Sequence, residues 1–84
     1  MRLPAWMALE CFKRDGWHCR NCNSTQNLHP HHIVYKSQGG PDTLYNLVTL
    51  CMNCHRDVHE GKIIVNVPEG MVATAGNITL RSVK

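Results

Sequence analysis

The residues with the clearest chemistry in this sequence are four cysteines arranged as two C-x-x-C pairs. One pair is Cys19 and Cys22, and the other, after 28 intervening residues, is Cys51 and Cys54. Each pair offers two sulfurs to one tetrahedral ion, and the loop between the pairs can be long. Residues 17–23 favour turns, as a metal knuckle requires. The spacing therefore predicts a structural zinc site, which would hold the fold together and leave no coordination position open for chemistry.

Two other uses of paired cysteines compete with a zinc site. Disulfide bonds are disfavoured because the cysteine count of five is odd and no apolar signal segment is seen at the start. A thioredoxin-like redox motif is disfavoured because two C-x-x-C copies occur without a βαβ pattern. Cys11 is left as the odd thiol, and we expect it on the inner face of a first helix.

Histidines form the second group, and three of the six lie in the stretch LHPHHI. His55 and His59 follow the second cysteine pair. On a helix beginning near Cys54 they project from nearly the same face, because four steps of about 100° leave an offset of only ~40°. Such a pair can clamp a transition metal, and His31 or His32 could supply a third ligand. The alternative is a solvated helix surface, but this pair directly follows a predicted zinc knuckle.

The elements that must position these residues are short. A helix is predicted over residues 2–15, with Pro4 near its start and a glycine after its end. Strands are predicted over residues 28–36 and 45–50, and a second short helix over residues 54–61. The stretch SQGGPD between the strands should be a loop, because Gly-Gly-Pro cannot continue a regular element.

The last part of the sequence predicts a loosely paired hairpin. Apolar and polar residues alternate in IIVNV and in NITLRSV, with Pro68, Gly70 and Gly76 between them. The expected fold class is therefore small α+β. A chain of 84 residues has room for one core, so we expect a single domain over residues 1–84 with a C-terminal extension over residues 62–84.

The order of C-x-x-C, HHI, Asn46-Leu47 and LCMNCHRDVH resembles the HNH endonuclease family, in its cysteine-containing zinc-knuckle subclass. The resemblance runs from about Cys19 to His59, within a motif core of about residues 17–61. It implies a ββα-metal (His-Me finger) core with a four-cysteine zinc knuckle, preceded here by a short N-terminal helix. It also implies an endonuclease that uses a metal to hydrolyse DNA phosphodiester bonds.

The resemblance also implies individual roles. His32 falls at the position of the general base that activates water, and His31 falls at a metal ligand. Asn46 falls on the central asparagine of the motif, which braces the loop bearing the base; the alternative is an asparagine that caps a turn. His55 falls on the final motif histidine, a metal ligand, and His59 falls where some members have a further ligand.

His31 stands where many members of the family have an aspartate. An imidazole there lowers the negative charge of the site and shifts its preference from Mg²⁺ toward softer divalent ions. The candidates for the catalytic ion are thus Mn²⁺, Ni²⁺, Mg²⁺, Co²⁺ and Zn²⁺. The structural ion at the cysteines is expected to be a separate Zn²⁺. Adjacent residues of a regular strand face opposite ways, so we expect Pro30 and the nearby loop to distort the strand enough for His31 and His32 to share a site.

The formal net charge of +3 favours a polyanionic partner without identifying one. The main hypothesis is an endonuclease acting on double-stranded DNA with low sequence specificity, because so small a module has little surface for reading bases. The rival hypothesis is a non-catalytic, zinc-ribbon-like nucleic-acid-binding module. A second copy of the chain, forming a homodimer, and a phage or mobile-element DNA-packaging component are further candidate partners. Reduced thiols and the lack of a long apolar run indicate a cytoplasmic protein.

Overall fold

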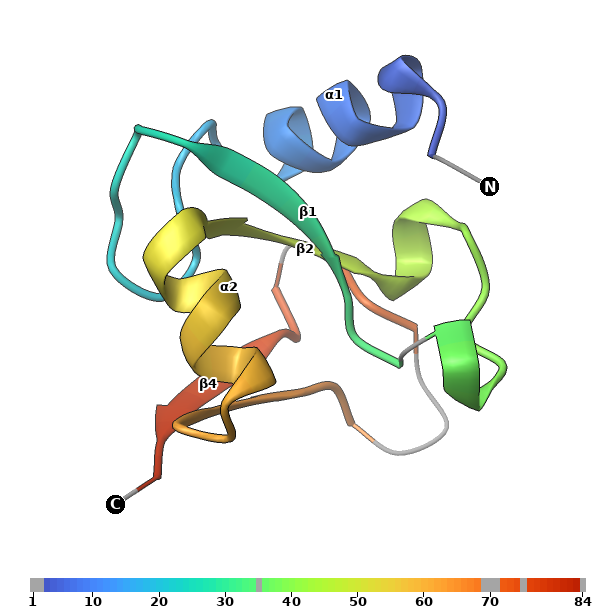
Figure 1. Ribbon diagram of the computed structural model, residues 1–84. Coiled ribbons are helices and arrows are strands. Elements are labelled where there is room, and N and C mark those ends of the chain that lie inside the picture. Colours follow the sequence, from blue (N-terminus) through green and yellow to red (C-terminus); the bar gives the residue numbers. More distant parts are fainter. Residues whose placement is uncertain (1–2, 35, 69–71, 75, 84) are drawn as a thin grey trace.

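The structure, a computed structural model, describes residues 3–34, 36–68, 72–74 and 76–83. Within these residues the fold is small α+β, with two helices and two small antiparallel sheets (Figure 1). The elements are α1 (Ala5–Arg14), β1 (Leu28–His32), η1 (Lys36–Gln38), η2 (Leu44–Asn46), β2 (Leu47–Cys51), α2 (Met52–His59), β3 (Ile63–Asn66) and β4 (Thr79–Ser82). None of the described helices has the length and apolar character needed to cross a membrane.

The β1–β2 hairpin is the centre of the fold, and α1 and α2 lie on either side of it (Figure 1). Successive side chains of a strand point to opposite faces. Thr49 of β2 faces α1, where its Oγ1 lies 3.4 Å from the Sγ of Cys11. Val48 and Leu50 instead belong to the hydrophobic core that includes Val58 of α2. Cys11 is fully buried, which confirms its predicted place on the inner face of the first helix.

The predicted C-terminal hairpin is confirmed by the antiparallel pairing of β3 and β4. Ile63 of β3, together with Ala73 and Ile78 from the connection between the two strands, packs into the same hydrophobic core as α2. The extension therefore packs against both α2 and the first hairpin and helps to hold that helix in place (Figure 1). Gly70, which was expected between the strands, lies outside the described residues.

The first helix and the first strand are shorter than predicted. Pro4, expected near the start of the helix, is the N-cap of α1, and the predicted start at residue 2 lies outside the described residues. The first strand ends at His32 instead of residue 36. It ends early because the backbone of Val34 bonds to the side chain of Asn46 rather than to a strand. Tyr35 lies outside the described residues.

The second strand and the second helix are shifted along the chain. A 3-10 turn, η2, precedes β2, so the strand begins at Leu47 rather than at residue 45. The helix begins at Met52, two residues earlier than predicted. The Sγ of Cys51 accepts a hydrogen bond from the N–H of Cys54 and so caps the first turn. The predicted loop SQGGPD overlaps η1 at its start.

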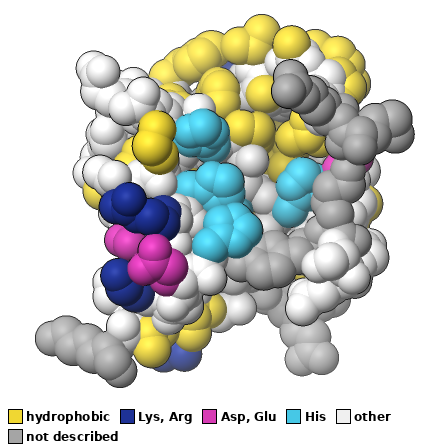
Figure 2. Space-filling model, in the orientation of Figure 1, with side chains coloured by type: hydrophobic (Ala, Val, Ile, Leu, Met, Phe, Trp, Pro, Cys, Tyr) yellow, Lys and Arg dark blue, Asp and Glu magenta, His cyan; other side chains and the backbone are white. Residues whose placement is uncertain are grey.

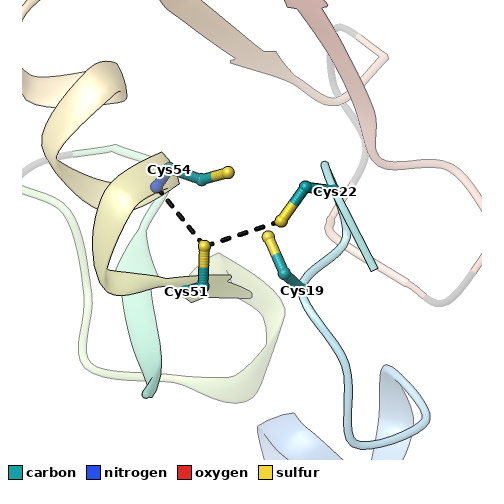
Figure 3. Close-up of side chains that lie close together, drawn as sticks. All are labelled: Cys19, Cys22, Cys51 and Cys54. Atoms are coloured by element: carbon teal, nitrogen blue, oxygen red, sulfur yellow. Dashed lines mark hydrogen bonds between the residues drawn. The ribbon is translucent and has the colours of Figure 1, made fainter. Parts of the chain in front are cut away.

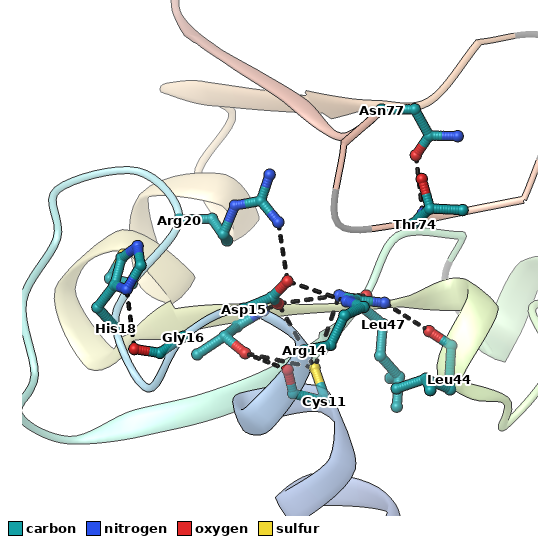
Figure 4. A network of polar contacts seen from close by, with 12 residues as sticks. Cys11, Arg14, Asp15, Gly16, His18, Arg20, Leu44, Leu47, Thr74 and Asn77 are labelled. Atoms are coloured by element: carbon teal, nitrogen blue, oxygen red, sulfur yellow. Dashed lines mark hydrogen bonds and ion pairs between the residues drawn. The ribbon is translucent and has the colours of Figure 1, made fainter.

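A buried carboxylate joins α1 to the rest of the protein (Figure 4). Asp15 follows α1 directly, and its side chain has no exposed area. Its oxygens accept hydrogen bonds from Arg14 at 2.9 Å, from Arg20 at 2.8 Å and from the backbone N–H of Thr49 at 2.9 Å. Arg14 also donates to backbone carbonyl oxygens of η2 and β2, at 2.9 and 2.6 Å. This network ties the first helix to both the knuckle and the central hairpin.

Replacing Asp15 by alanine is expected to lower the free energy of unfolding by about 3 kcal/mol, because two partly buried guanidinium groups would lose their counter-charge. The measurement is urea unfolding with zinc present. Glu10→Ala, on the exposed face of α1, is the control and should change stability by less than about 0.5 kcal/mol. Equal losses in the two variants would contradict the role of the network.

The same carboxylate makes stability depend on pH. Burial acts to raise the pKa of Asp15, but hydrogen bonds from Arg14 and from the backbone of Thr49 outweigh it and hold the pKa below its usual value. The bound proton is therefore disfavoured in the folded state. The contribution of the ionised Asp15 carboxylate to stability is complete above about pH 4, its pKa in the unfolded chain. This contribution is lost as the pH falls through the depressed pKa of the folded state.

Candidate metal centre and active site

The four cysteines of the two pairs meet at one point, although they come from two distant parts of the chain (Figure 3). Their Sγ atoms all lie within 4.8 Å of one another, and those of Cys22 and Cys51 are 3.6 Å apart. Two sulfurs bound to one tetrahedral zinc at ~2.3 Å would be about 3.8 Å apart, whereas a disulfide needs ~2.05 Å. The cluster therefore has the donor set and the spacing to hold a zinc ion.

N–H groups surround the sulfurs. Asn21 donates its backbone N–H to the Sγ of Cys19 at 3.4 Å and its side-chain Nδ2–H to the Sγ of Cys54 at 3.3 Å. Burial acts to raise the pKa of Cys19, but backbone N–H groups outweigh it and lower the pKa to about 7. Burial raises the pKa of Cys54. A cation is the counter-charge that lets all four cysteines ionise together.

A second cluster consists of three histidines from β1 and α2. Nitrogen atoms of His31, His55 and His59 lie within 4.8 Å of one another. The Nε2 atoms of His55 and His59 are 3.1 Å apart, close to the ~3.4 Å expected for two nitrogens at ~2.1 Å from one tetrahedral ion. Figure 2 shows histidine side chains gathered on the face that carries β1 and α2. One short helix thus serves two clusters, because neighbouring residues point about 100° apart.

The surroundings of two of these imidazoles, His31 and His55, favour their neutral form. Burial, followed by the neighbouring rings of His55 and His59, lowers the pKa of His31 to about 4. Burial and the neighbouring ring of His59 also lower the pKa of His55. His31 is 2% exposed, whereas His59 is exposed. Neutral imidazoles carry the free lone pair that a metal needs, and the exposed edge at His59 leaves the cluster open to a ligand from solution.

His29, to which the sequence analysis assigned no role, lies beside the histidine cluster. Its ring centroid is 5.6 Å from that of His55. His29 precedes His31 by two residues on β1, and the alternation of a strand puts both on the same face. That period of two already predicts from the sequence that His29 shares the face of His31.

Asn46 is buried and bonds across the loop that follows β1. Its Oδ1 accepts a hydrogen bond from the N–H of Val34 at 2.9 Å. Its Nδ2 donates to the carbonyl oxygens of Val34 and Pro41, at 3.0 and 3.1 Å. The backbone adds a further bond, from the N–H of Ile33 to the carbonyl oxygen of Asn46 at 2.8 Å. The side chain therefore joins the start of the loop to its end.

His32 lies at the end of β1, outside the histidine cluster. The strand pairing is continuous through this residue, and Pro30 stays in register with Thr49. The distortion expected at Pro30 is therefore wrong, since the pairing of β1 stays regular there. The ring of His32 nevertheless lies close enough to that of His31 to help lower the pKa of His31, after burial and the rings of His55 and His59. The Nε2 of His32 lies 2.7 Å from the Oδ1 of Asp42. Sequence spacing does not mark Asp42, because only the closure of the loop brings it to the strand.

Basic side chains near the clusters are engaged with acidic ones. Arg20 pairs with Asp15 at 2.8 Å. Arg56 and Lys62 contact Glu60 at 4.0 and 3.0 Å, and Figure 2 shows basic and acidic side chains together beside the histidines. Positive charge on this face is thus partly balanced within the protein itself.

Comparison with known proteins identifies the family to which this chain belongs. The family model described as HNH endonuclease matches residues 19–61, just over half of the chain. The Type IV methyl-directed restriction enzyme EcoKMcrA of Escherichia coli (strain K12) is 40% identical over 53 residues, which cover 52% of this chain and 19% of that protein. Anaredoxin of Nostoc sp. (strain PCC 7120 / SAG 25.82 / UTEX 2576) is 35% identical over 56 residues, covering 63% of this chain and 71% of that protein.

The chain thus spans about a fifth of the restriction enzyme and most of anaredoxin. No solved structure matches the chain. The family match begins at the first cysteine of the quartet and ends just after α2, so it contains both the cysteine and the histidine clusters. On this match, the chain belongs to the HNH endonuclease family.

Proposed function

We propose that this protein is a metal-dependent endonuclease that hydrolyses phosphodiester bonds of double-stranded DNA with low sequence specificity. The observation that carries the proposal is the convergence of His31, His55 and His59, beside a loop that Asn46 closes next to His32. Membership of the HNH endonuclease family and likeness to a restriction enzyme support a nuclease.

His32 is the proposed general base. It takes a proton from a water molecule as the water oxygen forms a bond to phosphorus. The bond from phosphorus to one sugar oxygen then breaks, and that oxygen takes a proton from solvent. An imidazole suits this step because it gains and loses a proton near neutral pH. Asn46 is the proposed brace, since its bonds to Val34 and Pro41 hold the backbone that follows His32.

His31, His55 and His59 would hold the catalytic divalent ion. When bound, such an ion supplies positive charge to a nonbridging phosphate oxygen and to the departing sugar oxygen. Three neutral imidazoles bring no negative charge, which favours Mn²⁺, Co²⁺, Ni²⁺ or Zn²⁺ over Mg²⁺. The four cysteines would hold a structural Zn²⁺, whose closed coordination leaves it no part in the reaction.

The test is plasmid cleavage with a panel of metals. Zinc-loaded protein and supercoiled plasmid are expected to give nicked and then linear DNA with Mn²⁺ or Ni²⁺, and more slowly with Mg²⁺. His55→Ala removes a metal ligand, so it should need more added metal for the same rate. Cys11→Ala is the control, because Cys11 lies outside both clusters. DNA binding without cleavage under every metal would contradict the nuclease.

That last outcome is the one expected of a non-catalytic, zinc-ribbon-like binding module, which the cysteine cluster would serve equally well.

The proposal extends to DNA within the cytoplasm, where thiol ligands stay reduced. One metal centre cuts one strand, so a double-strand break would need a homodimer or a second encounter. A phage DNA-packaging partner would be one setting in which the protein makes both cuts. Residues 1–84 would act as one domain, since β3 and β4 share the core of the motif.

A further inference from the structure

His32 forms a short hydrogen bond with an acidic side chain. Its Nε2 lies 2.7 Å from the Oδ1 of Asp42, and the two side chains are 18% and 28% exposed. Ion pairs between exposed, flexible side chains contribute little to stability. Here both side chains are partly enclosed and short, and the distance is that of a strong, charge-assisted bond. The contact therefore has the properties of a fixed pair.

The backbone on both sides of the pair is held by one buried side chain. His32 ends β1, and Asp42 lies just before η2. The carboxamide of Asn46 bonds to Val34, two residues after His32, and to Pro41, the residue before Asp42. The motif asparagine thus braces the segment that carries the acid as well as the segment that carries the base.

We infer that Asp42 is a positioning residue that holds His32 in the tautomer a general base requires. The inference rests on the proposed nuclease function. A carboxylate accepts hydrogen bonds only, so the Nε2 of His32 must carry the proton that is shared with Asp42. Nδ1 then keeps its lone pair and is the atom that takes the proton from water. The imidazolium formed by that transfer faces a carboxylate, which stabilises it.

If Asp42 did not position His32, removing its carboxylate would leave cleavage unchanged or faster rather than slower. Asp42 places negative charge close to where a phosphate must bind, and such a charge repels DNA. Its removal would then tighten binding and leave kcat unchanged or higher. Positioning predicts a lower kcat even though binding is unchanged or tighter. The direction of the change in kcat separates the two roles.

The kinetic test uses Asp42→Asn, which keeps the size of the side chain and removes its charge. The expected result is a fall in kcat of about 100-fold with KM unchanged or lower. Asp42→Glu restores a carboxylate on a longer side chain and should recover part of the lost kcat. Glu10→Gln removes the same charge from the exposed face of α1 and should change kcat by less than about twofold. A wild-type kcat in Asp42→Asn overturns the inference.

A second measurement does not depend on cleavage. Imidazole ¹⁵N–¹H spectra of the protein with zinc at the cysteines show which nitrogen of His32 carries the proton. The wild type should show a slowly exchanging proton on Nε2, and Asp42→Asn should lose its protection. A wild-type proton on Nδ1 overturns the inference even if the protein cuts DNA. An Nε2 proton in a protein that never cuts DNA would refute the nuclease, and with it the role of Asp42, while the pair itself would stand.

Discussion

Replacing His32 by alanine is expected to abolish plasmid nicking while DNA binding survives. A general base contributes about 10²- to 10⁴-fold to a reaction rate, so single-turnover nicking should fall at least 100-fold. The side chain is partly exposed at the end of β1 and lies outside both metal clusters. The fold and the bound metals should therefore be unchanged. The measurements are nicking with saturating protein and DNA affinity by fluorescence anisotropy.

Two matched histidine variants sharpen this prediction. His18→Ala removes an imidazole whose described hydrogen bond, to the carbonyl oxygen of Gly16, is exposed, and its nicking rate should equal that of the wild type. His31→Ala removes a proposed ligand, so it should lose the exchangeable metal together with activity, whereas His32→Ala should keep that metal. Undiminished nicking by His32→Ala would refute the assigned base.

Replacing Cys51 by serine is expected to unfold the protein at room temperature. Structural zinc contributes about 10 to 16 kcal/mol of apparent binding free energy, which exceeds the ~5 to 15 kcal/mol of total stability that domains usually have. Cys19, Cys51 and Cys54 are buried within the hydrophobic core, and the sulfur of Cys51 also caps α2. Losing the zinc site would therefore disrupt the core and the helix that carries two of the proposed metal ligands.

The measurements are metal content by atomic emission and thermal unfolding by circular dichroism. The wild type should hold one zinc that resists mild chelation and one exchangeable ion, and Cys51→Ser should hold neither and show no cooperative transition. Cys11→Ser is the matched control, because this buried thiol lies outside the quartet, and it should keep zinc with a smaller loss of stability. A folded Cys51→Ser variant without zinc would contradict the structural role.

The paired residues of both clusters were predictable because local geometry sets their spacing. Cys19 and Cys22 lie on one turn, and the i, i+4 spacing of His55 and His59 places them on one helical face. Such spacings survive large uncertainty in where elements begin and end. The start of α2 at Met52, two residues before the predicted start, did not move any ligand out of its cluster.

Contacts made across loops were not predictable in the same way. The path of the chain after β1 depends on Gly39, whose φ of +83° is open mainly to glycine, and on the bonds from Asn46 that close the loop. That path brings Asp42 back to His32, which lies 10 positions earlier in the chain. No period or short motif encodes such a meeting.

The sequence by itself determined the cysteine and histidine pairs of the two clusters, the small α+β class and the resemblance to HNH endonucleases, because these follow from residue types at short, regular separations. Tertiary structure alone decided that β1 stays regular at Pro30, that Asp15 joins α1 to the knuckle and hairpin, and that an acid faces the proposed base. These features depend on which distant backbone segments pack together. That packing is set by the burial of the whole core rather than by any one stretch of residues.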